Sequence, residues 1–437
     1  MRSHPRSRPC AGRRASTFIA VALLGAAAGA LAQEAPPDDP EARRLREEAE
    51  AELEGGGPQP ADEGERLRRA AEVETEDQSP EMNQLLQAYY AVANRLNTFN
   101  PRITVFGDVV GRLSASSAET VVDGRNIDDR VALEEVELDL RADIDPYAKG
   151  VVILAFEEVG GGEYEAEVEE GYLTLETLPL GFHAQLGRFR VPFGRINRLH
   201  RHDLPHTTRP WPTVDFFGQD GFIEQGVVLT WLAPVFPLEL TAALLNGENE
   251  RILAGGDSDD PSWLGRAEAF FQLGQFAFAS VGASYLFGYN DAPGPVDLRG
   301  RPERETHLWG ADLLFKYQWN QFQSIVVQGE VYHLRREVGG PGDREYGFGG
   351  YALLQVQPLQ RWYLGVRYDW SNYDEGREDA EQYAIGGWVS FYTTEFLRFR
   401  VGYEHRERQE DPDLDTVYFQ VTFVFGSHPV EPFWFNR

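Results

Sequence analysis

The chain has 437 residues and a formal net charge of −29, from 41 basic and 70 acidic side chains. So strong a negative charge opposes binding to the phosphate backbone of nucleic acid, and we therefore expect no nucleic-acid partner. The single cysteine, Cys10, excludes a disulfide within the chain, so the stability of the fold must come from packing and hydrogen bonding.

Residues 1–32 have the pattern of a bacterial secretory signal peptide. Five arginines precede the apolar run FIAVALLGAAAGAL at 18–31, and Ala30 and Ala32 fit the small-residue cleavage site that follows such a run. We expect this segment to be removed on export, and Cys10 with it. No later stretch contains eighteen consecutive apolar residues, so no spanning helix is expected.

Residues 33–80 are rich in Glu, Asp, Arg, Ala, Pro and Gly, and such an acidic segment is expected to be a disordered linker. Residues 81–99 differ, because apolar side chains recur there at spacings of three and four. This spacing predicts a short periplasmic helix, which could either form a coiled coil that assists a trimer or pack against its own domain. The apolar positions are Met82, Leu85, Tyr89, Val92, Leu96 and Phe99.

From Pro101 onward the period of the hydrophobic pattern changes to two, which is the period of a β-strand. In residues 417–425, one face carries only apolar side chains, while the opposite face is mostly polar. Residues 361–371 and 397–406 show the same alternation. The apolar face of the first example consists of Val417, Phe419, Val421, Phe423 and Phe425.

The alternation predicts sixteen antiparallel strands within 100–437, most of them long enough to cross a bilayer when tilted, which takes about 9 to 11 residues. Short turns such as 145–146 separate longer loops, among which we count 115–129, 159–162 and 191–221. An even strand number with long loops on one rim is typical of an outer-membrane barrel. We therefore predict an all-β fold, a sixteen-stranded transmembrane β-barrel preceded by the short helix. The predicted strands are 102–114, 130–144, 147–158, 163–177, 181–190, 222–232, 236–246, 263–273, 276–288, 304–318, 320–335, 345–357, 360–373, 380–393, 396–409 and 414–425.

The predicted third loop, residues 191–221, contains RINRLHRHDLPHTTRP at 195–210, which is basic although the chain is acidic. The interior of a sixteen-stranded barrel is wide enough for an aqueous channel. A cationic segment folded into that channel would narrow it and bias which ions enter. We therefore predict a pore constriction formed by Arg195, Arg198, His200, Arg201, His202, His206 and Arg209.

Two other interpretations of this segment remain open. His200, His202, Asp203 and His206 are residue types that bind zinc or copper. The loop offers no helical pair of histidines, Pro205 interrupts it, and the neighbouring arginines repel cations, so we expect neither a metal nor another cofactor. The segment could also be an exposed polar loop without a selective role.

The alternating pattern also assigns side chains to the barrel interior. If Leu133, Leu138 and Leu140 face lipid, the acidic residues between them line the lumen, whereas arginines of two late strands line the opposite wall. An acidic wall facing a basic wall would produce a transverse field. The predicted lumen-facing residues are Glu135, Glu137, Asp139, Arg367, Arg398 and Arg400.

Three stretches resemble the phosphate-selective porin family: LGRFRVPFG at 186–194, FIEQGVVLTW at 222–231 and FNPRITVFGD at 99–108. The resemblance implies passive, anion-selective uptake through a trimer whose pores are lined by basic residues. The chain departs from that pattern because its only lysines are Lys149 and Lys316, so arginines would have to form the basic lining.

These patterns predict a porin of the bacterial outer membrane, with lipid and small charged solutes as partners and a homotrimer as the assembly. Charge at the narrowest point should outweigh charge more than a Debye length of about 8 Å away, which weakly favours anions. We find no nucleophile with a base and an orienting group on neighbouring strands, so we predict no catalytic residues and no enzyme. The alternatives are an energised receptor for a specific ligand or metal, which needs about 22 strands and a plug, and a structural tether with a closed pore.

Overall fold

The computed structural model describes residues 101–115, 121–122, 125–126, 130–160, 162–254, 260–292, 304–339, 342–373, 381–409 and 413–426. The expected signal peptide (1–32), acidic linker (33–80) and short helix (81–99) lie outside these described residues.

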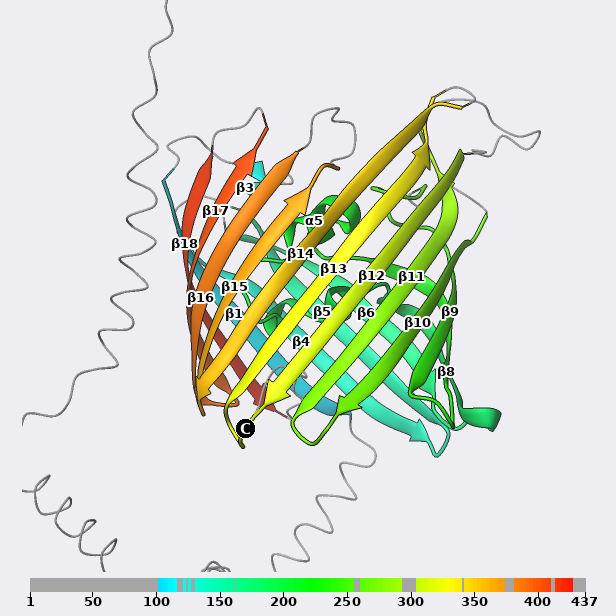
Figure 1. Cartoon of the computed structure of the whole chain (residues 1–437), viewed down its shortest axis with the longest axis horizontal. Coiled ribbons are helices and arrows are strands. Elements are labelled where there is room, and N and C mark those ends of the chain that lie inside the picture. Colours follow the sequence, from blue (N-terminus) through cyan, green and yellow to red (C-terminus); the bar gives the residue numbers. More distant parts are fainter. Residues whose placement is uncertain are drawn as a thin grey trace, which may run out of the picture. The chain divides into compact units, whose positions relative to one another are not determined.

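Sixteen antiparallel strands close into one barrel, which Figure 1 shows from the side. Consecutive barrel strands pair with each other, and β1 closes the barrel by pairing with β18. The predicted fold class is therefore confirmed, and each predicted strand overlaps one observed strand. The barrel strands are β1 (Arg102–Ser114), β4 (Val131–Asp145), β5 (Ala148–Gly160), β6 (Glu163–Leu175), β7 (Phe182–Arg190), β8 (Ile223–Leu232), β9 (Leu238–Leu245), β10 (Ser262–Leu273), β11 (Ala277–Asn290), β12 (Arg304–Gln318), β13 (Ser324–Glu337), β14 (Arg344–Leu359), β15 (Trp362–Ser371), β16 (Gln382–Thr394), β17 (Leu397–Arg408) and β18 (Leu414–Gly426).

The period of two sorts side chains between the barrel interior and its outer surface. On β18, Tyr418, Gln420 and Thr422 are buried, whereas Phe419 and Phe425 are about half exposed. Apolar side chains are exposed in the same way on other strands, including Phe156, Val227, Val281, Val331, Val366 and Val401. An apolar outer surface of this extent would be unfavourable in water and is suited to contact with lipid.

Two β-bulges direct additional carboxylates into the barrel. The ladder between β1 and β4 skips Glu134, and the ladder between β5 and β6 skips Glu169. A bulge places two residues opposite one, so neighbouring side chains need not alternate between the faces. As a result, the adjacent residues Glu169 and Glu170 are both buried.

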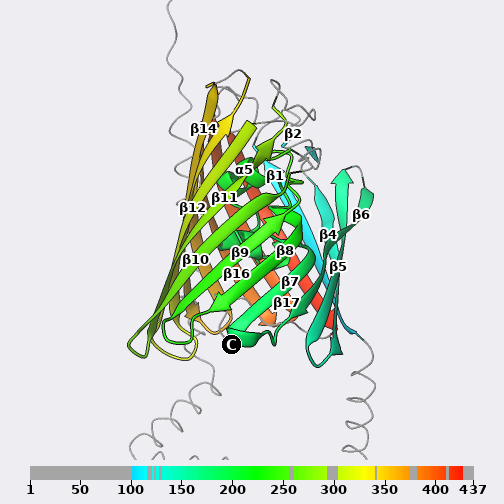
Figure 2. The same cartoon turned by 90° about the vertical axis from the view of Figure 1, so that its right-hand side faces the viewer.

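The connections differ between the two rims of the barrel, as Figure 2 shows. One rim has short turns throughout. The other has long connections, one of which contains the two-stranded hairpin of β2 (Val121–Val122) and β3 (Arg125–Asn126). The prediction of a longer loop at 159–162 is wrong, because β5 runs to Gly160 and β6 begins at Glu163. The two strands simply extend farther toward the turn than the sequence pattern indicated.

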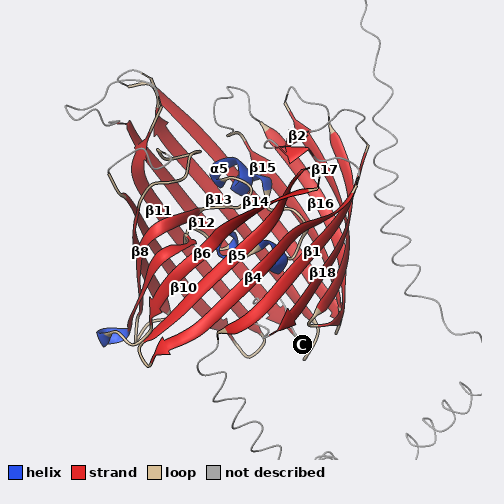
Figure 3. Cartoon of the chain, turned by 180° about the vertical axis from the view of Figure 1, so that it is seen from behind, coloured by secondary structure: helices blue, strands red, loops and turns tan. Residues whose placement is uncertain are grey.

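The connection between β7 and β8, residues 191–222, folds into the barrel and is hereafter called the internal loop. It contains the short helices η2 (Ile196–Arg198), η3 (Arg201–Asp203) and α5 (Trp211–Phe217), which lie within the ring of strands in Figure 3. A separate short helix, η1 (Pro179–Gly181), lies in the turn before β7. In the described part of the chain, no helix has the length and apolar character needed to cross a membrane.

Apolar side chains attach the internal loop to the wall. Phe193, Phe216 and Phe217 belong to a buried cluster that includes Tyr332 and Leu334 of β13. A second cluster joins Ile196 and Leu204 of the loop to Tyr351, Leu353 and Trp388 of the wall. The buried apolar area fixes the path of the loop and leaves its polar groups directed at defined positions on the wall.

Candidate functional site

Carboxylates of β10, β12 and β13 bind the beginning of the internal loop. The Arg195 guanidinium contacts the Glu268 carboxylate and lies 3.7 Å from Asp312 Oδ1. The backbone N–H groups of Arg195 and Ile196 donate to Glu330 Oε1, with distances of 3.1 and 2.5 Å. Glu330 therefore holds the backbone at the point where the chain turns into the lumen.

A cluster of two histidines and three carboxylates joins the middle of the loop to β4 and β6. His200 Nδ1 lies 3.2 Å from Glu169 Oε2 and 3.4 Å from Glu137 Oε2, while His200 Nε2 lies 3.4 Å from Glu170 Oε2. His202 Nδ1 lies 3.2 Å from Glu137 Oε2. All five side chains are buried. We call this set the His–Glu cluster.

The carboxylates of the His–Glu cluster favour the charged form of its histidines. Burial lowers the pKa of His200, but the charge of Glu137 and hydrogen bonds to Glu137 and Glu170 outweigh burial and raise the pKa to about 10. Burial also lowers the pKa of His202, and the charges of Glu137 and Asp203 outweigh it and raise that pKa. His200 is therefore charged at neutral pH unless another cation takes the place of its proton.

Two arginines of β17 converge on a single carbonyl oxygen of the loop. Leu204 O accepts hydrogen bonds from Arg400 Nη2 at 2.8 Å and from Arg398 Nη1 at 3.4 Å. Their other partners are neutral hydroxyl and amide groups, such as Gln420 and Thr422. Neither guanidinium lies within ion-pair distance of a carboxylate in the described part of the chain, and Asp108 is linked to them only through Gln420 and Thr422.

A third arginine, Arg367 of β15, is compensated. Its guanidinium pairs with Asp369 at 2.9 Å and with Glu404 at 3.0 Å, and it donates to the Thr208 carbonyl at 2.7 Å. Arg367 Nη1 also lies 2.6 Å from His206 Nδ1. Burial, followed by the charges of Arg367 and Arg400, holds the pKa of His206 well below its usual value. His206 is therefore neutral and adds no positive charge to the lumen.

The first turn of α5 is fixed to the same wall by Trp211. Its backbone N–H donates to Asp369 Oδ2 at 3.1 Å, and its indole N–H donates to Glu404 Oε1 at 2.9 Å. Pro212 follows it inside the first turn of α5, where a missing N–H is tolerated. These contacts of Trp211 anchor the N-terminal end of α5 to β15 and β17.

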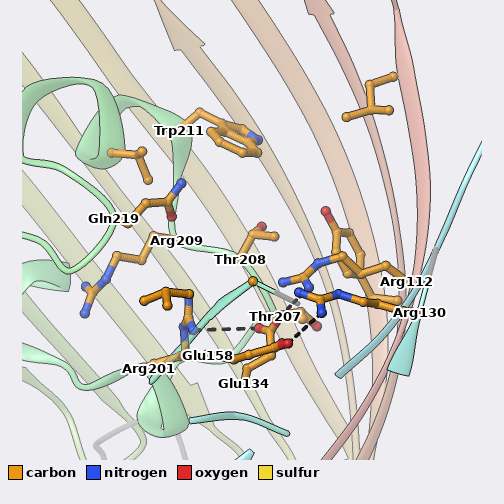
Figure 4. A pocket seen from close by; sticks show the side chains of 15 residues that line it. Arg112, Arg130, Glu134, Glu158, Arg201, Thr207, Thr208, Arg209, Trp211 and Gln219 are labelled. Carbon is orange, nitrogen blue, oxygen red and sulfur yellow. Dashed lines mark hydrogen bonds and ion pairs between the residues drawn. The ribbon is translucent and has the colours of Figure 1, made fainter. Parts of the chain in front are cut away.

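A polar pocket of about 80 Å³ lies between the internal loop and the wall of β1, β4, β5 and β18. Four arginines and two glutamates contribute to it, as Figure 4 shows, together with Thr207, Thr208 and Trp211. Arg130 pairs with Glu158 at 2.5 Å, while Arg112 and Arg201 both contact Glu134. The charged residues of the pocket are Arg112, Arg130, Glu134, Glu158, Arg201 and Arg209.

Arg209 is the arginine of this pocket that lacks a carboxylate partner among the described residues. Its Nη2 donates to the Leu199 carbonyl at 3.0 Å, and its Nη1 has no hydrogen-bond partner although the side chain is buried. Burial, followed by repulsion from Arg190 and Arg201, lowers the pKa of Arg209 to about 9. Arg209 therefore remains charged at neutral pH. Its Nη1 has hydrogen atoms that can be donated to an anion in the pocket.

The structure places the predicted constriction residues inside the barrel but compensates most of their charge. Arg195, Arg198 and Arg201 each lie within 4.0 Å of wall carboxylates. Arg198 is the most exposed of the three, with 42% of its side chain accessible. The basic segment of this acidic chain is therefore complementary to the acidic wall that it contacts.

The predicted lumen-facing residues are all buried, and all of them contact the internal loop except Asp139, which pairs with Arg141 of its own strand. They are Glu135, Glu137, Asp139, Arg367, Arg398 and Arg400. Sequence reasoning missed Glu169 and Glu134, because strict alternation does not anticipate a bulge. It also missed Arg112 and Arg130, whose proximity depends on the pairing of β1 with β4.

A closed sixteen-stranded barrel with an apolar outer surface and an internal loop defines a β-barrel protein of the bacterial outer membrane. No family model matches the chain. An uncharacterized protein of Aquifex aeolicus (strain VF5) is 31% identical over 339 residues, which cover 69% of this chain and 70% of that protein. The chain belongs to the same family as this relative.

Solved structures with a similar fold are outer-membrane channels. The channel DcaP of Acinetobacter baumannii superposes with a TM-score of 0.50 and 12% identity, over 75% of this chain and 96% of DcaP. The anion-selective porin from Comamonas acidovorans gives a TM-score of 0.50 and 11% identity, over 74% of this chain and 100% of the porin. At these identities the similarity establishes the barrel architecture.

Proposed function

We propose that the protein is an outer-membrane porin for passive diffusion of small charged solutes, with a weak preference for anions. The internal loop, predicted at 191–221, forms the constriction of the pore. Solutes pass beside the loop, along the wall where the arginines of β17 and the polar pocket lie. The observation that carries this proposal is the inward-folded loop, whose polar groups bind the wall on several sides.

The preference for anions rests on the arginines without carboxylate partners. Arg195, Arg198 and Arg201 have little net effect on a passing ion, because wall carboxylates offset their charge. Arg209, Arg398 and Arg400 have no carboxylate within ion-pair distance among the described residues, and the carboxylates that act on Arg209 and Arg400, such as Asp220 and Asp108, lie farther away. At a narrow point walled by protein, the charges of these arginines attract anions and repel cations more strongly than they would in bulk water.

The comparisons support this proposal at the level of architecture. The solved structures of similar fold are channels, and one of them is described as anion-selective. Assembly as a homotrimer and membership of the phosphate-selective porins are further parts of the proposal, and they rest on the sequence resemblance.

The test is the reversal potential of the refolded protein in a planar bilayer under a salt gradient. We expect open channels whose anion-to-cation permeability ratio falls in Arg209→Gln and in the double variant Arg398→Gln/Arg400→Gln. The matched control is Arg344→Gln, which removes the same charge from a largely exposed position at the start of β14, and it should leave the ratio unchanged. Each variant is first checked for folding by its heat-dependent electrophoretic shift.

Two results would contradict this proposal. Channels with unaltered selectivity in both arginine variants would mean that ions do not pass these residues, and the constriction proposal would be wrong. A folded wild-type protein without conductance would contradict the porin itself and favour a structural tether with a closed pore.

A further inference from the structure

The His–Glu cluster has the composition and geometry of a metal site. One oxygen of Glu137, one oxygen of Glu169 and one ring nitrogen of His200 all lie within 4.8 Å of one another. These groups are imidazole and carboxylate, the ligands that zinc and related divalent metals bind in proteins without thiolates. The three residues come from β4, β6 and the internal loop, so no short sequence motif could have revealed them.

The distances within the cluster agree with tetrahedral coordination. Metal bonds of about 2.0–2.1 Å place neighbouring ligand atoms about 3.3 Å apart at the corners of a tetrahedron. His200 Nδ1 lies 3.2 Å from Glu169 Oε2 and 3.4 Å from Glu137 Oε2, and His202 Nδ1 lies 3.2 Å from Glu137 Oε2. His202 is not among the three residues whose ligand atoms all lie within 4.8 Å of one another, so the site has three protein ligands and an open fourth position.

The Glu137 carboxylate faces nitrogen atoms of both histidines. It is 1% exposed, and in the described residues its Oε2 lies 3.4 Å from His200 Nδ1 and 3.2 Å from His202 Nδ1. A buried carboxylate needs a positive charge beside it, which either protonated histidines or a bound cation would supply.

The surrounding groups match the outer shell of a metal site. When Nδ1 of His200 binds a metal, its Nε2–H faces Glu170 Oε2 at 3.4 Å, which orients the ring. The other oxygen of Glu169 contacts Arg190 Nη2, and the Arg190 backbone N–H donates to Glu170 Oε1 at 2.6 Å. The ring of His202 stacks on Phe106, with centroids 3.6 Å apart.

The charges of the cluster also suit a divalent ion. Glu137, Glu169 and Glu170 carry three negative charges, and the guanidinium of Arg190 balances one of them. Two negative charges remain when the histidines are neutral, and one divalent cation would balance both. The rival arrangement has no metal and holds both histidines as imidazolium ions.

We propose that Glu137, Glu169 and His200 bind one divalent transition-metal ion of the zinc type, which fastens His200 of the internal loop to β4 and β6. This metal site is a proposal separate from the diffusion channel. Zinc binding does not require ion conductance, so an experiment can contradict one proposal and leave the other standing.

The experiment measures zinc bound to the full chain, refolded in detergent, after metal-free dialysis. Wild type is expected to retain one zinc ion per chain, and Co²⁺ in its place should give the visible absorption of a tetrahedral site. His200→Ala and Glu137→Gln should lose the ion. Glu170→Gln, which alters only the outer shell, should weaken zinc affinity about 10- to 100-fold.

The matched control is His405→Ala on the outer face of β17. His405 also contacts two carboxylates, Asp415 at 2.8 Å and Glu407 at 3.3 Å, so it represents adventitious binding by a surface histidine. This variant should retain the zinc ion. All variants are compared only when the heat-dependent electrophoretic shift shows a folded barrel, and the wild-type stoichiometry stands as a test even if one variant does not fold.

Three results would overturn the site. Wild type could bind no zinc, which would assign the cluster to imidazolium–carboxylate pairs. Zinc could remain bound in both His200→Ala and Glu137→Gln, which would place the ion elsewhere. Loss of zinc in His405→Ala alone would show that only the surface histidine binds it.

Discussion

Arg406 Cζ lies 3.4 Å from the centroid of the Trp211 indole ring, a close contact between a guanidinium and an aromatic face. The same indole donates its N–H to Glu404. The first residue of α5 is therefore bound to β17 both by its ring face and by its ring edge. This contact attaches the C-terminal part of the internal loop to the wall. The charged groups of residues 195–202 attach the part before it.

Trp211→Ala should release α5 from the wall. Replacing a buried tryptophan by alanine costs about 3–5 kcal/mol, and the variant would also remove the indole donor of Glu404 Oε1. The internal loop contains three trypsin sites, at Arg195, Arg198 and Arg201, because Pro210 blocks cleavage after Arg209. We expect trypsin to cleave at these sites in the folded variant much faster than in wild type, as mass spectrometry of the fragments would show.

The control for this prediction is Trp231→Ala. Trp231 is partly exposed on β8, and its indole donates to the Leu180 carbonyl in the turn before β7, at the end of that strand opposite to the internal loop. If both tryptophan variants gave the same fragments at the same rate, the Trp211 contacts would not be what holds the loop.

Gly194→Ala should displace the start of the internal loop. Gly194 has φ +64, and a Cβ atom there would collide with the Glu330 carboxylate, which accepts the N–H groups of Arg195 and Ile196. The expected cost is about 1–3 kcal/mol from the collision, in addition to about 1 kcal/mol from the left-handed backbone. The midpoint of urea unfolding in detergent is the measurement.

Gly339→Ala is a closely matched control for the backbone effect. Gly339 has the same φ of +64, but the nearest atom to an added Cβ is Asp343 Oδ2 at 3.3 Å. It should therefore show the backbone cost without a severe collision. Equal losses of stability in the two variants would contradict a special role for the contact between Gly194 and Glu330.

Much of this fold follows from the sequence, because the period of two marks the barrel strands, apart from bulges such as those in β4 and β6. The sequence also predicted that the basic segment 195–210 enters the channel and that one wall of the lumen is acidic. It could not show which charges would cancel, since the pairs Arg195–Glu268 and Arg201–Glu134 join positions distant in the chain. Nor could it show the His–Glu cluster, which depends on a bulge at Glu169 that breaks the alternation.

The stability of the barrel should depend on pH through His206. Its folded-state pKa lies well below the unfolded value of about 6.5, so below that pH the unfolded chain takes up a proton that the folded chain does not. Stability is therefore lost as the pH falls from about 6.5, by at most about 1.4 kcal/mol per pH unit for this one group. His206→Gln should reduce this loss.

The measurement for His206 is the free energy of unfolding by urea at several pH values between 7 and 5, for wild type and His206→Gln. The difference between the two proteins isolates His206 from the carboxylates and other histidines that titrate in the same range. Parallel pH dependence would mean that Arg367, at 2.6 Å, does not keep His206 neutral in the folded protein.

The cost of placing a charge on the outer surface of the barrel should depend on its depth in the bilayer. Val331, near the middle of β13, is 58% exposed, and Leu359, at the short-turn end of β14, is 50% exposed. An arginine on the lipid face costs about 2–4 kcal/mol at the bilayer midplane and about 0–1 kcal/mol near the interface. Val331→Arg should therefore destabilise the barrel in liposomes far more than Leu359→Arg does. Because the two side chains are similarly exposed, equal effects would show that β13 and β14 do not cross the bilayer as their positions in the barrel require.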